Sequence, residues 1–114
     1  MEITDSVEVP GAKGLFTTKS HENESIVYVL SGTIFDHPTR ESIHIGENKH
    51  IYDEYGIFIN HSFKPNVRVD GYKLVALRNI NAGEEIVFNY NSTEINMSNP
   101  FYIGNQIVSG KNNI

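Results

Sequence analysis

Apolar and β-branched residues occur along this chain in short runs, and turn-forming residues separate one run from the next. Short runs bounded by Gly, Pro, Asn and Asp are typical of β-strands. The most apolar run, Ser25–Leu30, closes at Ser31-Gly32. We therefore expect strands at residues 7–9, 15–18, 25–30, 42–45, 50–52, 67–69, 72–74 with an extension through Leu77, and 85–90.

Two of these strand pairs are predicted to form hairpins. The strands at 67–69 and 72–74 flank Asp70-Gly71, a dipeptide that accepts the positive φ angles of a type I′ turn. The strands at 42–45 and 50–52 flank Gly46-Glu47-Asn48-Lys49, and this pairing would bring His44 opposite His50.

No stretch of the sequence shows a sustained apolar period of 3.6 residues, which excludes a long amphipathic helix. Short helical turns are predicted at 53–56 and at 93–97, where Asn91 or Ser92 is a suitable cap. The pattern therefore predicts a mostly β fold with little helix. Periodicity alone leaves a barrel and a sandwich equally open.

Composition limits the possible functions. The chain has 114 residues, no cysteine and a formal charge of −5. The missing cysteines exclude disulfides, thiolate-bound zinc and a catalytic thiol. The acidic balance argues against direct nucleic-acid binding and suits a basic protein partner. The sequence shows neither a secretory signal nor an apolar run long enough for a membrane span, so we expect a cytoplasmic protein, or one acting in a host nucleus if it is viral or a secreted effector.

Two segments carry the most specific information: Asn60-His61-Ser62-Phe63-Lys64-Pro65-Asn66 and Gly83-Glu84-Glu85-Ile86-Val87-Phe88-Asn89-Tyr90. Either segment alone would be read as a polar turn or the start of a strand. Together, in this order and at this separation, they resemble the paired signature of SET-domain protein-lysine methyltransferases. The resemblance extends over roughly residues 6–102 and implies a SET β-clip fold with a C-terminal pseudoknot.

The resemblance also implies an S-adenosylmethionine site. Ala12-Lys13-Gly14-Leu15-Phe16 resembles the family's glycine-rich loop, with Ala12 in place of the first glycine and Gly11 one residue earlier. The residues implied to bind the cofactor are Lys13, Gly14, Leu15, Asn60, His61, Tyr90 and Phe101. Asn60 would bond the amino-acid end of the cofactor, and His61 would pair through its backbone with the adenine edge, so that its imidazole is not the catalytic base. Asn66 is expected to bond locally in the turn.

Tyr90 is implied to be the catalytic residue. Methyl transfer to lysine requires a neutral amine and in-line alignment, and a tyrosine hydroxyl can orient the amine without a strong general base. Phe88, Tyr90 and Tyr102 would line the substrate channel, and phenylalanine at position 88 predicts room for di- or trimethylation. Of the adjacent carboxylates, Glu84 is expected to be exposed in a turn and Glu85 to be structural.

The C-terminal tail departs from the family pattern. Asn99-Pro100-Phe101-Tyr102 is present, but the zinc-binding cysteines of related bacterial proteins are missing. We therefore expect a SET domain at residues 1–102 and a tail at 103–114 without a zinc site. Such a tail could pair with a second copy, so a homodimer is possible.

Alternative readings remain open. A SET-like module that is weakly active or inactive, and serves protein interaction, is compatible with Ala12 and the short tail. A generic β-barrel that binds a peptide along an edge strand would explain the strands but not the two segments. The histidines lack a nearby carboxylate at ligand spacing, so no metal site is predicted.

Overall fold

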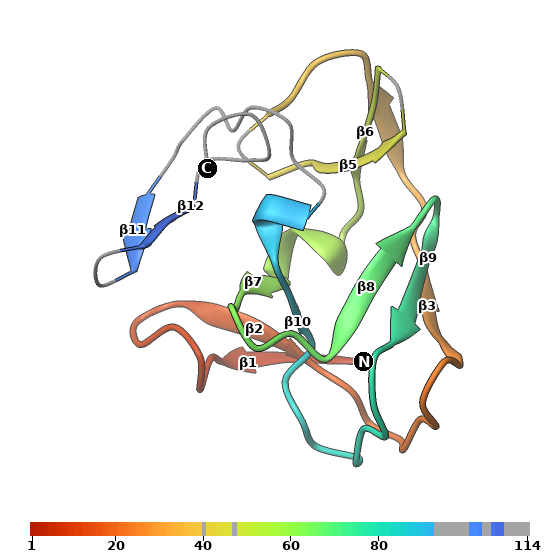
Figure 1. The fold of residues 1–114 in the computed structure, drawn as a ribbon, viewed down its shortest axis with the longest axis vertical. Helices are drawn as coiled ribbons and strands as arrows, with labels where there is room; N and C mark the ends of the chain where they lie inside the picture. The colour runs from red at the N-terminus through yellow and green to blue at the C-terminus, as the bar shows by residue number, and fades with distance from the viewer. Residues whose placement is uncertain (40, 47, 93–100, 104–105, 109–114) are drawn as a thin grey trace.

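A computed structural model describes residues 1–39, 41–46, 48–92, 101–103 and 106–108 of the chain. Within these residues the backbone forms short strands and two 3-10 turns, which confirms the mostly β fold (Figure 1). The two three-stranded sheets have the orders β3-β9-β8 and β4-β6-β5. Their strands are β3 (Ile26–Val29), β9 (Lys73–Ala76), β8 (Val67–Asp70), β4 (Thr33–Phe35), β6 (Lys49–Tyr52) and β5 (Ile43–Gly46).

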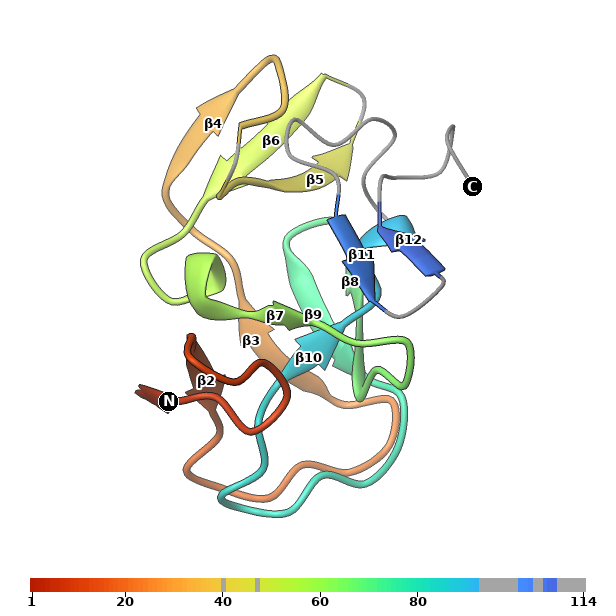
Figure 2. The same ribbon diagram turned by 90° about the vertical axis from the view of Figure 1, so that its left-hand side faces the viewer.

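Three two-stranded pairs complete the described fold. Strand β1 (Glu2–Asp5) runs antiparallel to β2 (Lys13–Phe16), and β11 (Phe101–Ile103) runs antiparallel to β12 (Gln106–Val108). Strand β7 (Asn60–His61) runs parallel to β10 (Val87–Phe88). The β4–β6–β5 sheet lies at one end of the molecule and the β1–β2 pair lies toward the other, with β7 and β10 between them (Figures 1 and 2).

Both predicted hairpins form. In the β8–β9 hairpin Asp70 pairs with Lys73, so the turn residues are Gly71 and Tyr72. Only Gly71 has a positive φ, at 58°. A positive φ at the first central residue alone is the pattern of a type II′ turn, so the predicted type I′ turn is wrong. The turn lies one residue later than expected, so Asp70 stays in the strand, and glycine alone takes the positive φ that would be costly for Tyr72.

In the β5–β6 hairpin His44 pairs with His50, as expected. The two imidazole rings stack with their centroids 4.4 Å apart. Strand β4, which the sequence analysis missed, adds to the other edge of β6 and pairs Ile34 with Ile51.

The N-terminal prediction is wrong. Residues 7–9 form no strand, and the strand lies at Glu2–Asp5 instead. All four residues of β1 are exposed, so no buried face marks them in the sequence. They are extended because β2 offers them a pairing edge.

The predicted helical turns also shift. The turn expected at 53–56 is observed as a 3-10 turn at Gly56–Phe58, and a second 3-10 turn spans Tyr90–Ser92. The buried Asp53 side chain initiates the first, because its carboxylate accepts hydrogen bonds from the amides of Tyr55 and Gly56 at 2.8 and 2.7 Å. The turn predicted at 93–97 lies outside the described residues.

The hydrophobic core lies between the sheets and against the parallel β7–β10 pair. Its largest members are Phe88, Leu15, Leu30, Ile51 and Leu74, each at most 2% exposed. Core side chains thus come from β2, β6, β9 and β10 and fix these strands against one another.

Candidate active site

The two motif segments meet in the parallel pair of β7 and β10. Asn60 lies beside Val87, and His61 lies beside Phe88. The pairing continues past β7, because the Ser62 amide donates to the Phe88 carbonyl at 3.1 Å. Two segments that are far apart in the sequence are therefore adjacent. We call this contact between β7 and β10 the crossing; it is the part of the predicted pseudoknot that the described residues contain.

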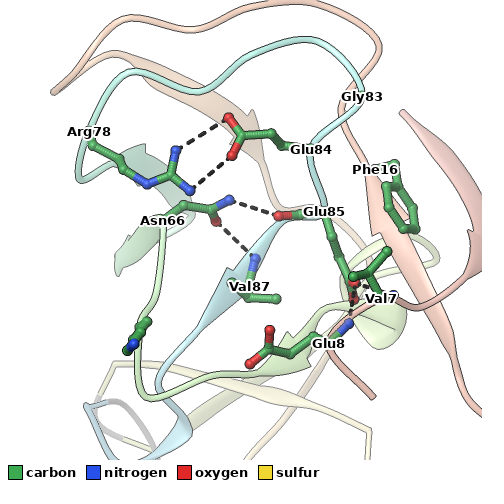
Figure 3. A pocket seen from close by; sticks show the side chains of 10 residues that line it. Val7, Glu8, Phe16, Asn66, Arg78, Gly83, Glu84, Glu85 and Val87 are labelled. Atoms are coloured by element: carbon green, nitrogen blue, oxygen red, sulfur yellow. Dashed lines mark hydrogen bonds and ion pairs between the residues drawn. The ribbon is translucent and has the colours of Figure 1, made fainter. Parts of the chain in front are cut away.

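Asn66 holds the second segment in place with both ends of its amide. Its Nδ2 donates to the Glu85 carbonyl at 2.7 Å, and its Oδ1 accepts from the Val87 amide at 2.9 Å (Figure 3). The residue is only 1% exposed. The prediction that the Asn66 side chain bonds locally is therefore wrong. Its partners lie about twenty residues later in the sequence, and the two bonds fix the start of β10.

Tyr90 is held at two points by the segment that contains β7. Its hydroxyl donates to the Ile59 carbonyl at 2.6 Å, and its backbone amide donates to Nδ1 of His61 at 3.0 Å. With its proton directed to Ile59, the hydroxyl can act on further groups only as an acceptor. An acceptor is what an amine N–H or a polarised methyl group needs.

His61 is a structural imidazole. It is 2% exposed, and burial lowers its pKa to about 4. Since Nδ1 accepts the Tyr90 amide, the ring carries its proton on Nε2 and is neutral near pH 7. The expectation that the His61 ring is not the catalytic base stays a prediction.

An aromatic cluster surrounds the Tyr90 ring. The Phe88 ring lies 4.9 Å from it and the His61 ring 5.2 Å, measured between centroids. Phe63 packs edge-on against His61 at 4.4 Å. Phe88 is 2% exposed, so its ring is both part of the core and a fixed neighbour of the catalytic candidate. The substrate-channel role of Phe88 stays a prediction.

Asn60 faces the glycine-rich loop. Its Nδ2 donates both hydrogens, one to the Lys13 carbonyl at 2.9 Å and one to Oε2 of Glu85 at 3.0 Å. The amide oxygen is then the atom that remains for a ligand. A carbonyl-type acceptor suits a cationic ammonium, so the residues fit the amino-acid end of S-adenosylmethionine, although through one atom of Asn60 and not both.

The Glu85 side chain accepts hydrogen bonds from several parts of this region. Its carboxylate accepts from the Ser6 hydroxyl at 2.7 Å and from the amides of Val7 and Glu8 at 2.8 and 3.0 Å, besides Asn60. Burial alone would raise the pKa of Glu85, but these hydrogen bonds outweigh it and lower the pKa. Glu85 is therefore structural, as expected, and ionised.

Glu84 points elsewhere. Its carboxylate pairs with the Arg78 guanidinium at 2.9 Å and accepts from the Asn81 amide. With 31% of its side chain exposed, it is a half-buried ion-pair partner and not the freely exposed turn residue that the sequence predicted.

In the glycine-rich loop, Gly11 and Gly14 are needed for two different reasons. Gly11 has the positive φ, at 85°, and so supplies the freedom that Ala12 lacks. Gly14 has no positive φ, but a Cβ there would overlap the Glu85 carboxylate. The Leu15 side chain is fully buried in the core, so only its backbone can serve a cofactor.

The structure brings Lys13, Gly14, Asn60, His61, Phe88 and Tyr90 around the β7–β10 crossing. Phe101 and Tyr102 lie in β11, and their side chains are outside what the structure describes. The β11–β12 hairpin spans the predicted domain boundary after residue 102, and that boundary stays a prediction.

A separate hollow of about 300 Å³ lies beside this region (Figure 3). Charged side chains on its wall include Glu8, Lys64, Arg78 and Glu84. No predicted cofactor residue lines it, so it is not the site that the resemblance implies. Glu85 borders both.

Sequence reasoning missed two contributors to the site. Ile59 acts through its carbonyl oxygen, which no side-chain pattern reveals. The long reach of Asn66 was also missed, although its position in the first segment was a signal that it mattered.

In the described part of the chain no group of three or more histidine, aspartate or glutamate side chains is placed to hold a metal ion. Nor do those residues include a helix long and apolar enough to cross a membrane.

The fold and the paired segments define a β-clip protein whose candidate site is the aromatic cluster around Tyr90. The family model for the SET domain matches residues 7–91, so the chain belongs to the SET-domain family of protein-lysine methyltransferases. Among solved structures, a Plasmodium falciparum protein provisionally assigned as a histone methyltransferase superposes with a TM-score of 0.59. It is 22% identical, and the match covers 78% of this chain and 94% of that one, which supports the fold. No curated protein matches the chain significantly.

Proposed function

We propose that the chain is an S-adenosylmethionine-dependent protein-lysine N-methyltransferase that acts on a basic protein tail, histone or histone-like. The observation that carries the proposal is the double anchoring of Tyr90, whose hydroxyl is fixed on the Ile59 carbonyl and whose amide is fixed on His61. A hydroxyl held this rigidly in an aromatic cluster is suited to orienting a reacting amine.

Each residue near the crossing has a defined task under this proposal. Asn60 offers an acceptor oxygen to the ammonium of the cofactor, and the backbone of Lys13 to Leu15 forms the adjoining wall. The cofactor supplies an electrophilic methyl group on a sulfonium. Tyr90 accepts from the lysine amine, and Phe88 keeps the approach dry.

Deprotonation of the lysine does not require a dedicated base. An apolar surrounding destabilises the charged ammonium and lowers the pKa of a lysine, and a neighbouring sulfonium charge lowers it further. The His61 ring adds no charge that would change the pKa of the lysine, because burial keeps this ring neutral near pH 7. The proton then passes to solvent before the methyl group transfers.

The charge of the chain supports a basic substrate. A formal charge of −5 attracts a lysine-rich segment and speeds its encounter, and the effect weakens as salt increases. A cytoplasmic location, or a host nucleus, and a homodimer remain part of the proposal.

The test is transfer of labelled methyl from S-adenosylmethionine to core histones and to a mixed cell lysate. Tyr90→Phe should abolish label while leaving the circular dichroism spectrum unchanged. Tyr72→Phe is the matched control, because Tyr72 is 45% exposed in the β8–β9 turn and should transfer as the wild type does.

Binding is measured separately by the thermal midpoint with and without S-adenosylhomocysteine. A ligand bound only by the native state adds about 2.7 kcal/mol of stability at a hundredfold excess over Kd. A shift without any label would indicate a competent cofactor site that still lacks its substrate. Neither shift nor label would favour the inactive SET-like interaction module.

A further inference from the structure

The Glu85 carboxylate joins three parts of the chain that are distant in sequence. Oε1 accepts from the amides of Val7 and Glu8, and Oε2 accepts from Asn60. The Ser6 hydroxyl bonds the same carboxylate at 2.7 Å. Gly14 allows this arrangement, because any side chain there would strike the carboxylate.

The Glu85 carboxylate also fixes the orientation of the Asn60 side-chain amide. The inner edge of that amide faces Oε2 of Glu85 and the Lys13 carbonyl, and both of these groups only accept hydrogen bonds. A flipped amide would place its oxygen against two acceptors and leave both unsatisfied. Nδ2 is therefore forced toward these two acceptors, and Oδ1 points away from them.

We infer that Glu85 is a positioning residue for the cofactor site: it sets the Asn60 amide so that an acceptor oxygen, and not an N–H group, meets the ammonium of the bound cofactor. This inference rests on the proposed function. It assigns to Glu85 a role in affinity that acts through Asn60, beyond holding the N-terminal loop.

Glu85→Gln separates these two roles. The amides of Val7 and Glu8 donate to Oε1, so the glutamine oxygen stays there and continues to anchor the loop. The new nitrogen then takes the place of Oε2 and presents N–H groups to Asn60. The Ser6 hydroxyl, which donates to Oε2 at 2.7 Å and to Oε1 at 3.0 Å, keeps Oε1 as its acceptor. Asn60 has to turn its oxygen inward, and its own N–H groups then face the ammonium.

The expected result is a specific loss of affinity. S-adenosylhomocysteine, measured by titration calorimetry, should bind Glu85→Gln roughly 10- to 100-fold more weakly, as expected for a lost hydrogen bond to a charged group. In methyl transfer the KM for the cofactor should rise more than kcat falls. Glu84→Gln makes the same chemical change one residue away, at the Arg78 ion pair, and should bind as the wild type does.

A reciprocal exchange tests the mechanism directly. Asn60→Asp alone sets two carboxylates against each other and should weaken binding. Combined with Glu85→Gln, the aspartate accepts from the glutamine with one oxygen and keeps the other as an acceptor for the ammonium. The contact of the aspartate with the Lys13 carbonyl is the same in the single and the double variant, so it cancels in the comparison. If the two single losses of affinity were independent, they would add in the double variant. The double variant should instead bind at least tenfold more tightly than this sum predicts, which shows that the two residues are directly coupled.

A further measurement needs no variant. The side-chain amide hydrogens of Asn60 should exchange with solvent more slowly than those of Asn79, an exposed asparagine, in nuclear magnetic resonance spectra. Equal exchange, wild-type affinity in Glu85→Gln, or additive losses in the double variant would each overturn the inference alone. A wild type that binds no S-adenosylhomocysteine would overturn both the inference and the proposed function.

Discussion

Replacing Asn66 with alanine should destabilise the protein more than any surface substitution does. The side chain is 1% exposed and satisfies two backbone groups, the Glu85 carbonyl at 2.7 Å and the Val87 amide at 2.9 Å. In Asn66→Ala both groups lose this partner, and the Val87 amide loses it at a buried position. These two bonds are also the ones that fix the start of β10.

The magnitude follows from the cost of an unsatisfied buried group. Each such group costs about 1–3 kcal/mol, so two cost roughly 2–6 kcal/mol before any relaxation. Domains of this size are stable by about 5–15 kcal/mol, so the variant should lose a large part of its free energy of unfolding. Urea denaturation followed by circular dichroism measures this as a lower midpoint with an unchanged slope.

Asn79→Ala is the matched control for this change. Asn79 is exposed and accepts one hydrogen bond, from the Asn23 amide at 2.8 Å. Its loss should cost less than about 1 kcal/mol, because solvent can replace it. If Asn66→Ala costs no more than Asn79→Ala, the Asn66 side chain does not fix the start of β10.

Two further predictions concern the aromatic cluster. Burial lowers the pKa of His61 from 6.5 to about 4, so the unfolded chain takes up this proton at a higher pH than the folded chain does. Neutral His61 therefore contributes on the order of 3 kcal/mol to the free energy of unfolding. This contribution is complete above about pH 6.5 and is lost as the pH falls toward 4. Urea titrations at pH 7 and pH 4.5 should show this loss in the wild type and a smaller one in His61→Asn, and equal losses would contradict it. Phe88→Tyr adds a hydroxyl beside Tyr90 and, under the proposed function, should shift products from di- and trimethyl-lysine toward monomethyl-lysine by mass spectrometry; an unchanged distribution would exclude Phe88 as the residue that sets the product.

The sequence predicts best what is decided locally. The β8–β9 and β5–β6 hairpins were predicted because a turn sequence lies between two apolar runs. Strand β1 was missed because its residues are exposed and extended only through pairing with β2. Residues 7–9 look like a strand, but the amides of Val7 and Glu8 bond a carboxylate more than seventy residues away.

The same distinction holds for the site. The roles of Tyr90, Asn60 and His61 follow from the family resemblance that the two segments carry, and these roles stay predictions. Their partners could not be predicted, since a backbone carbonyl such as that of Ile59 carries no residue signature. The strand predicted at 85–90 shrinks to Val87–Phe88, because the Asn66 side chain bonds its start and a 3-10 turn begins at Tyr90.

The segment 59–61 links the two tasks of the proposed enzyme. The Ile59 carbonyl and the His61 ring hold the hydroxyl and the amide of Tyr90, while Asn60 between them faces Lys13 and Glu85. Successive side chains of an extended segment point to opposite faces, so Asn60 can present a ligand acceptor on one face while the His61 ring holds the Tyr90 amide on the other. A displacement of β7 would therefore change cofactor affinity and methyl transfer together, whereas Glu85→Gln should affect mainly the first and Tyr90→Phe mainly the second.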